Sequence, residues 1–181
     1  KKAHPLRYQQ DAKVIKPQFV IETVFEMTKH DAIVATDVGQ HQMWAGQYFK
    51  GTTPRTFITS GGLGTMGFGF PAALGAQKAF PERPVLCITS EGSFQMNLQE
   101  LATAAQQKLP VKIVLLNNQF HGMVRQWQDL FYEGRYASSH LGNTPDFVKL
   151  AAAYGIVGLR AVKPKEVQKT LREGLTHKEP V

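Results

Sequence analysis

Two short apolar runs, each followed by side chains that can bind a cation, constrain this chain more than any other feature. Residues 85–88 (Val-Leu-Cys-Ile) predict a buried strand that leads to Glu91, and residues 111–116 predict another that leads to Asn117 and Asn118. Between the runs, apolar residues recur at helical spacing: Leu98, Leu101, Ala102 and Ala105. Strands joined through a helix run parallel, and open α/β sheets bind ligands at the carboxyl ends of their strands. The pattern therefore predicts a site for a hard cation that carries phosphate oxygens.

The rest of the chain alternates strands and helices in the same way. Further strands are predicted at 32–36, 56–59 and 156–159, and helices at 17–27, 71–79, 122–132, 147–154 and 164–177. Alternation of this kind is typical of a three-layer α/β/α fold with a mostly parallel sheet. We expect residues 1–16, which are polar and basic, to be a linker or lead-in, and residues 17–181 to form one domain.

Composition excludes several classes of protein. No apolar run approaches the roughly 18 residues that a membrane helix needs. The net charge of +7 is concentrated at the two ends of the chain, and no basic stripe with interleaved aromatic residues is present. We therefore expect neither a membrane span nor a nucleic-acid partner. The single cysteine, Cys87, lies within an apolar run. It is predicted to be a core residue, excludes a disulfide within the chain and favours a reducing compartment.

A glycine-rich stretch admits two interpretations. Gly62, Gly64 and Gly67 follow a predicted strand, precede a predicted helix and match G-x-G-x-x-G, and Glu91 comes 24 residues after Gly67. This spacing is close to that of a nicotinamide or flavin Rossmann domain, in which the acid binds a ribose. That alternative explains neither the Gly92-Ser93 pair that opens a helix nor the paired asparagines. Both are explained if Glu91 and Asn118 hold Mg²⁺ while N–H groups at a helix start meet a diphosphate.

Four stretches together resemble a known family. Ser90-Glu91-Gly92, then 24 residues, then Asn117-Asn118 resembles the thiamine-diphosphate motif Gly-Asp-Gly…Asn-Asn. Residues 37–44, 59–67 and 122–132 are similar to the C-terminal domain of acetolactate synthase (acetohydroxyacid synthase) catalytic subunits. The similarity extends from about residue 15 to about residue 175. It implies the thiamine-diphosphate-binding fold, with a last strand after this stretch and with pyrimidine-binding and flavin-binding domains before it.

The resemblance assigns roles by position. The metal ligands would be the side chains of Glu91 and Asn118 and the carbonyl of Phe120. The diphosphate would meet four residues: Gln40, His41, Gly92 and Ser93. The cofactor's ring system and the substrates would meet a further set: Gly64 at the aminopyrimidine, Met66 as a prop for the bent cofactor, Met123 in its pocket, and Trp127 in the second-substrate pocket. From spacing alone, simple core packing is the alternative for Met66, Met123 and Trp127. The family's activating glutamate lies in another domain, so no catalytic residue is assigned here.

The implied activity is decarboxylation of pyruvate and transfer of the two-carbon unit to pyruvate or 2-oxobutyrate, in branched-chain amino-acid biosynthesis. Implied cofactors are thiamine diphosphate and Mg²⁺, with FAD in another domain. Implied partners are further copies in a dimer or tetramer and a regulatory small subunit, in the bacterial cytoplasm or a eukaryotic organelle. We expect this stretch alone to be inactive. Three alternatives stay open at this point: another thiamine-diphosphate carboligase, decarboxylase or oxidase, a nicotinamide-binding domain, and a non-catalytic assembly module.

The centre of the motif departs from the family pattern. Glu91 and Ser90 stand where the family has aspartate and glycine. Glutamate keeps the charge and the hard oxygens but moves the carboxylate outward by about 1.5 Å, one C–C bond. Because Mg²⁺ requires near-octahedral oxygens at about 2.0–2.1 Å, the substitution predicts weaker Mg²⁺ and cofactor binding than an aspartate would give. A domain that no longer catalyses is the stronger form of the same hypothesis.

Overall fold

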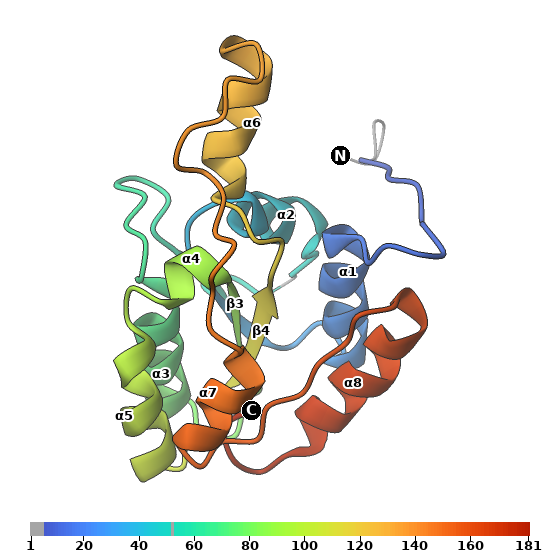
Figure 1. Cartoon of the computed structure of the whole chain (residues 1–181). Coiled ribbons are helices and arrows are strands. Elements are labelled where there is room, and N and C mark those ends of the chain that lie inside the picture. Colours follow the sequence, from blue (N-terminus) through green and yellow to red (C-terminus); the bar gives the residue numbers. More distant parts are fainter. Residues whose placement is uncertain (1–5, 52) are drawn as a thin grey trace.

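A four-stranded parallel sheet forms the centre of the molecule (Figure 1). The computed structural model describes residues 6–51 and 53–181. The strands stand in the order β2-β1-β3-β4, and all three pairs of neighbours are parallel. Their bounds are Ile33–Thr36 for β1, Phe57–Thr59 for β2, Val85–Ser90 for β3 and Lys112–Leu116 for β4. The central strands β1 and β3 are apolar and buried because helices cover both of their faces.

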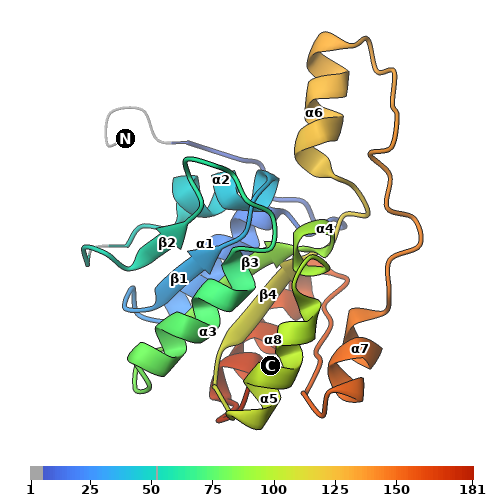
Figure 2. The same cartoon turned by 90° about the vertical axis from the view of Figure 1, so that its left-hand side faces the viewer.

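Alternate strand residues point to opposite faces and build two separate cores. Ile33 and Ala35 of β1 pack into the first core and Val34 into the second. The first core is covered by α3 (Gly69–Ala79), α5 (Leu101–Gln106) and α7 (Phe147–Ala153), and the second by α1 (Pro17–Met27), α2 (Gln40–Tyr48) and α8 (Pro164–Thr176). Figure 2 shows the sheet between these two groups of helices. The predicted three-layer α/β/α class is confirmed.

Most predicted elements are present, and local chemistry explains where several of them begin. Pro17 opens α1 at the position where its missing N–H costs nothing. The side chain of Asp146 caps α7 by accepting the N–H groups of Val148 and Lys149. The predicted helix at 98–105 is divided, because Leu98–Glu100 forms a 3₁₀ turn before α5 begins. Within the described residues, no helix has the length and apolar character that crossing a bilayer requires.

One helix was not predicted from the sequence. No helix or strand was predicted for residues 40–48, whereas Gln40 begins α2, a nine-residue helix. Its sequence, Gln-His-Gln-Met-Trp-Ala-Gly-Gln-Tyr, has no clear apolar stripe, so periodicity does not reveal it. It is held instead by burial of Ala45 and Tyr48 in the second core.

The described part of the lead-in, residues 6–16, is irregular and packs onto the second layer of helices. The ring of Tyr8 meets Tyr48 edge-on at 5.5 Å between centroids, and its hydroxyl donates to Glu22 at 2.7 Å. Residues 1–5 lie outside the described residues. The proposed boundary between a lead-in and a domain at residues 16 and 17 stays a prediction.

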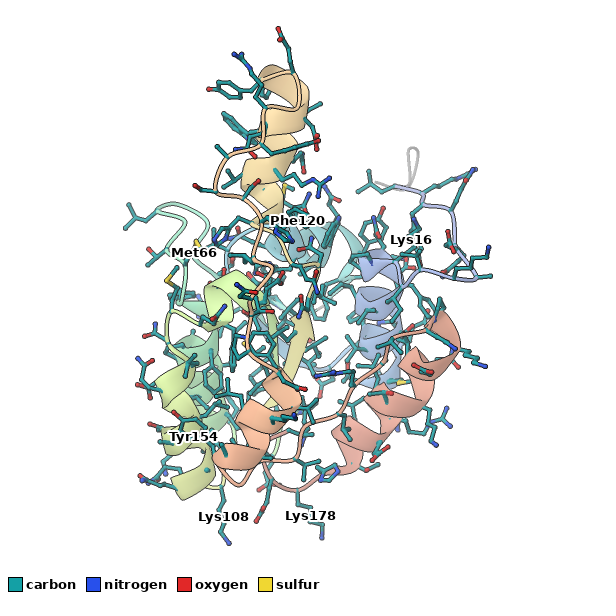
Figure 3. All side chains as sticks on the ribbon, in the orientation of Figure 1. Lys16, Met66, Lys108, Phe120, Tyr154 and Lys178 are labelled. Atoms are coloured by element: carbon teal, nitrogen blue, oxygen red, sulfur yellow. The ribbon has the colours of Figure 1, made fainter. Side chains whose placement is uncertain are left out.

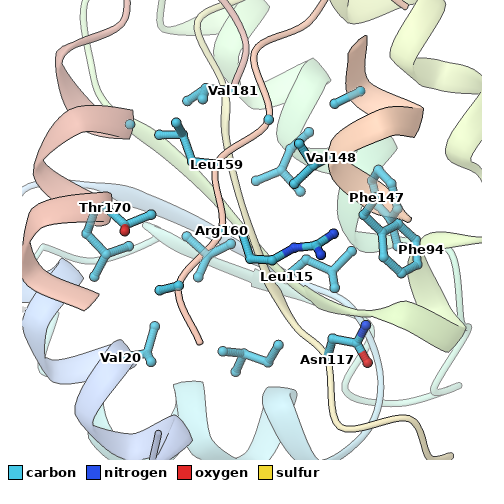
Figure 4. Close-up of a pocket in the computed structure, with 18 of the residues that line it drawn as sticks. Val20, Phe94, Leu115, Asn117, Phe147, Val148, Leu159, Arg160, Thr170 and Val181 are labelled. Atoms are coloured by element: carbon cyan, nitrogen blue, oxygen red, sulfur yellow. The ribbon is translucent and has the colours of Figure 1, made fainter. Parts of the chain in front are cut away.

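The prediction of a strand at residues 156–159 is wrong. These residues are irregular, and a cavity of about 780 Å³ separates them from β4, with Leu115 on one wall and Leu159 on the other (Figure 4). A strand requires a hydrogen-bonded neighbour, and among the described residues only Val181 pairs with this edge, through Val111 and Ile113. The apolar run therefore lines a groove, although Ile156 still reaches the first core.

Candidate functional site

The order of the strands places one functional edge. The chain leaves β1 toward β2 and returns to the opposite side of β1 as β3, so the carboxyl ends of β1 and β3 meet at the point where the strand order reverses. Open α/β sheets bind ligands at this point. Gln40 and His41 follow β1, and Glu91, Gly92 and Ser93 follow β3. The two turns touch, because Ser93 Oγ donates to the carbonyl of Val38 at 2.8 Å.

Glu91 also meets the turn that follows β4. Its side chain is completely buried. Glu91 Oε1 accepts the N–H of Asn118 at 3.2 Å and that of Phe120 at 3.0 Å. Glu91 Oε2 is equally buried and has no hydrogen-bond partner among the described residues. The predicted meeting of the acid and the asparagines therefore occurs, and one carboxylate oxygen remains available for a ligand.

The surroundings of Glu91 fit a hard cation. Burial raises the pKa of this carboxyl, while backbone N–H groups of Glu91 and of residues 118–120 act to lower it. A cation near Oε2 would stabilise the ionised form, because an unpaired charge is costly to bury. The described residues contain no group of three or more His, Cys, Asp or Glu side chains that could hold a metal. A cation here would therefore depend on the Glu91 carboxylate, the Asn118 amide oxygen, the Phe120 carbonyl and oxygens from a ligand.

A neighbouring segment fixes the turn after β4. The N–H of His121 donates to Ser139 at 2.8 Å, and the N–H of Leu141 donates to Gln119 at 2.7 Å. These two bonds use the carbonyls of Ser139 and Gln119, not that of Phe120. Gln119 adopts φ +63°, and the Asn118 side chain accepts the N–H of Phe120 at 3.0 Å.

Two of the predicted diphosphate residues make specific contacts with their surroundings. Gly92 lies under His121, since a Cβ built on Gly92 would come within 2.8 Å of His121 Cε1. Gln40 reaches α6 (Gly122–Phe131), where its amide donates to Gln126 Oε1 at 3.0 Å. Sequence reasoning missed the position of His121, because nothing in the spacing shows which residue covers a glycine.

His41 is buried at the start of α2. Burial lowers the pKa of His41 to about 4, although a hydrogen bond to the backbone of Asp37 acts to raise it. His41 is therefore neutral at pH 7. Its Nε2 has no partner among the described residues, so this nitrogen can serve a bound ligand.

The glycine-rich turn before α3 reaches the same edge. Gly64 adopts φ +64°, a conformation that favours glycine, and Met66 is half-buried. Figure 3 shows Met66 and Phe120 at the end of the molecule from which α6 projects. The buried carboxylate of Asp37 binds this turn, through Gly67 at 2.8 Å and Gly69 at 3.2 Å. Asp37 follows the strand predicted at 32–36, but no role was predicted for it.

The two predicted pocket residues on α6 differ in exposure. Met123, in the first turn of α6, is half-buried. Trp127, one turn further on, is 56% exposed, and its ring meets that of Phe131 edge-on at 5.5 Å between ring centroids. Core packing, the alternative interpretation of Trp127, is wrong. Trp127 is not among the residues that line the cavity beside Asn117 and Asn118.

The positions of the glycines argue against a Rossmann site. In that fold the acid lies at the end of the strand next to the one that precedes the glycine turn. Here β2 precedes the turn and β3 carries Glu91, with β1 between them. Glu91 instead faces Asn118 and Phe120.

Comparison with known proteins agrees with this geometry. Residues 37–181 match the family model described as "Thiamine pyrophosphate enzyme, C-terminal TPP binding domain". The chain is 55% identical over 170 residues to "Acetolactate synthase isozyme 3 large subunit" of Escherichia coli, covering 94% of this chain and 30% of that protein. It is 51% identical over 186 residues to "Acetolactate synthase catalytic subunit, mitochondrial" of Saccharomyces cerevisiae, covering 100% of this chain and 27% of that protein.

The chain thus spans less than a third of the length of these relatives. The family match begins at Asp37, directly after β1, and includes every predicted site residue from Gln40 to Trp127. The chain therefore belongs to the thiamine pyrophosphate enzymes, as their C-terminal TPP-binding domain.

Proposed function

We propose that this chain is the thiamine-diphosphate- and Mg²⁺-binding domain of an acetolactate synthase, which decarboxylates pyruvate and transfers the two-carbon unit to a second 2-oxo acid. The observation that carries the proposal is the buried Glu91 Oε2, which has no hydrogen-bond partner among the described residues. It lies at the sheet edge where the Asn118 turn and the starts of α2 and α4 (Glu91–Phe94) converge. FAD, a regulatory small subunit and a bacterial or organellar compartment enter the proposal through the resemblance and the names of the relatives.

The residues of this chain would divide the work of holding the cofactor. Glu91, Asn118 and the Phe120 carbonyl would hold Mg²⁺, whose preferred ligands are hard oxygens. Backbone N–H groups at Gly92 and Ser93, together with Gln40 and His41, would meet the diphosphate, and Met66 would support the bent cofactor. When bound, thiamine diphosphate supplies the carbon nucleophile and the electron sink that decarboxylation of a 2-oxo acid requires.

Calorimetric titration tests this proposal against the nicotinamide alternative. We expect thiamine diphosphate to bind in the presence of Mg²⁺, to bind much more weakly with EDTA, and NAD not to bind. Binding of NAD without thiamine diphosphate would contradict the proposal. If the cofactor binds, acetolactate formation by a chain that also carries the preceding domains distinguishes a catalytic domain from a purely assembling one.

An exposed apolar surface on α6 supports association with a second copy. Figures 1 and 2 show α6 projecting from the body of the molecule. It carries four large apolar side chains that are 49–67% exposed: Val124, Trp127, Leu130 and Phe131. Contiguous apolar surface of this kind is typical of an interface. We propose that this surface, the α6 face, forms part of the dimer or tetramer contact.

Replacing Leu130 and Phe131 by serine is expected to abolish self-association. At the micromolar concentrations of light scattering, the wild-type chain should exceed the 20.1 kDa of one copy and the double variant should not. The control is Phe80→Ser, which changes a half-exposed phenylalanine just after α3, outside α6. A wild-type chain that is monomeric throughout, or a double variant that associates equally well, would contradict the role of the α6 face.

A further inference from the structure

Asp37 has a buried carboxyl group that the proposed cofactor contacts do not use. We infer that Asp37 is a positioning residue: its carboxylate holds the glycine-rich turn before α3 in the shape that presents Gly64 and Met66 to the cofactor. This inference rests on the proposed function. It assigns to Asp37 no contact with cofactor or substrate.

Three backbone N–H groups hold the Asp37 carboxylate, whose residue is 0% exposed. Oδ1 accepts the N–H of Val38 at 2.9 Å and that of Gly67 at 2.8 Å, and Oδ2 accepts the N–H of Gly69 at 3.2 Å. No cationic side chain forms an ion pair with it in the described part of the chain. Burying an unpaired carboxylate is costly, so these bonds determine both where the carboxylate lies and where the turn lies.

The turn has a shape that requires such an anchor. Gly67 adopts φ +91°, and its carbonyl accepts the side-chain amide of Asn97 at 2.8 Å. The backbone at Gly67 is therefore held through its N–H by Asp37 and through its carbonyl by Asn97. Gly69 packs directly on the end of β1, since a Cβ there would lie 2.5 Å from the backbone nitrogen of Asp37.

The part of the turn that carries Gly64 makes few contacts that would hold it in place. Residues 61–65 are exposed. Two of their N–H groups donate to Ser60, that of Gly64 at 3.2 Å and that of Thr65 at 3.0 Å. Met66 connects this exposed part to Gly67, which the bonds from Asp37 and Asn97 hold. Its position is consequently set from one side, by the Asp37 and Asn97 bonds.

The location of Asp37 also separates two parts of the site. Ser93, a predicted diphosphate residue, bonds to the carbonyl of Val38 and not to the Asp37 side chain. Because Oδ1 accepts the N–H of Val38 and Oδ2 accepts that of Gly69, a change confined to Oδ2 alters the turn that carries Met66, and we expect the hydrogen bond between Ser93 and Val38 to stay. A positioning role thus predicts weaker binding of the ring end of the cofactor and unchanged binding of its diphosphate.

Asp37→Asn tests this inference, because an NH₂ group must then face a backbone N–H in place of an acceptor oxygen. We expect the affinity for thiamine diphosphate at saturating Mg²⁺ to fall about tenfold, about the effect of one lost hydrogen bond to a charged group. The affinity for inorganic diphosphate with Mg²⁺ should change less than about twofold. Hydrogen exchange should accelerate in residues 61–68 and stay unchanged in β3 and β4.

Two further variants sharpen the test. Asn97→Ala removes the hydrogen bond to the Gly67 carbonyl. It should likewise lower the affinity for thiamine diphosphate and accelerate hydrogen exchange in residues 61–68. Asp146→Asn is the matched control, since Asp146 also accepts two backbone N–H groups but caps α7, away from the turn. It should leave the binding of both ligands unchanged.

The outcomes separate the inference from the proposed function. The positioning role alone is overturned if the Asp37→Asn chain binds thiamine diphosphate as tightly as wild type. It is also overturned if the affinities for thiamine diphosphate and inorganic diphosphate fall equally. A wild-type chain that binds inorganic diphosphate but not thiamine diphosphate overturns the proposed function, and the role of the turn with it. Selective loss of thiamine diphosphate with faster exchange at 61–68 supports both.

Discussion

Replacing Glu91 by glutamine is expected to reduce the affinity for Mg²⁺ by at least about 100-fold while leaving the fold intact. Changes in the partners of metal ligands already cost about 10–100-fold, and this change removes the anionic ligand itself. The glutamine carbonyl can still accept the N–H groups of Asn118 and Phe120, as Glu91 Oε1 does. Calorimetry with Mg²⁺ and thiamine diphosphate measures the loss, and thermal unfolding confirms that the turn is retained.

Glu91→Asp and Glu91→Ala complete this series. The aspartate variant is expected to bind Mg²⁺ more tightly than wild type, because it restores the family's carboxylate position. It should also be less stable by about 1–3 kcal/mol, because a shorter side chain leaves buried N–H groups of the 118–120 turn without an acceptor. Alanine should lose both metal binding and stability. Equal Mg²⁺ affinities for the wild-type chain and the Glu91→Asp variant, or a glutamine variant that binds Mg²⁺ normally, would contradict this role for Glu91.

Acidification is expected to destabilise the chain through His41. Its pKa is lowered to about 4 in the folded state, mainly by burial, whereas an exposed histidine titrates at about 6.5. The unfolded chain therefore takes up a proton first as the pH falls, so stability is fully present above about pH 6.5 and is lost between about pH 6.5 and 4. At about 1.4 kcal/mol per pKa unit, this loss amounts to about 3 kcal/mol.

Comparison with a variant separates the contribution of His41 from that of the other groups that take up protons over this pH range. The difference in the free energy of unfolding between wild type and His41→Gln should change by about 3 kcal/mol between pH 7 and pH 4. His140→Gln, which makes the same replacement at an exposed position, is the control for the substitution itself. A His41→Gln difference that is flat over the same range would show that His41 is not buried in its neutral form.

The sequence predicted those parts of the fold that depend on local patterns. Apolar runs gave the four strands, and spacings of three and four gave most helices. The prediction of a strand at 156–159 was wrong because a strand also needs a neighbouring strand to pair with. These residues face a cavity at the β4 edge instead. Helix α2 was missed for a related reason, since burial of Ala45 and Tyr48 in the second core, which periodicity does not reveal, holds it.

The candidate site divides in the same way. The meeting of Glu91 with the Asn118 turn was predictable, because parallel strands deliver their ends to one edge of a sheet. The contacts that shape the site were not. The Asp37 bonds to Gly67 and Gly69, the two backbone bonds to Glu91 Oε1 and the cover of His121 over Gly92 depend on turn conformations that no spacing specifies.

The central claim is that the edge formed by Glu91 and Asn118 holds a divalent cation together with thiamine diphosphate. A crystal structure of the chain with thiamine diphosphate and Mn²⁺, which replaces Mg²⁺ and scatters anomalously, tests this most directly. We predict an anomalous peak coordinated by Glu91 Oε2, the Asn118 amide oxygen, the Phe120 carbonyl and diphosphate oxygens. A peak that lies away from Glu91, or bound cofactor without any peak at this edge, would contradict the claim.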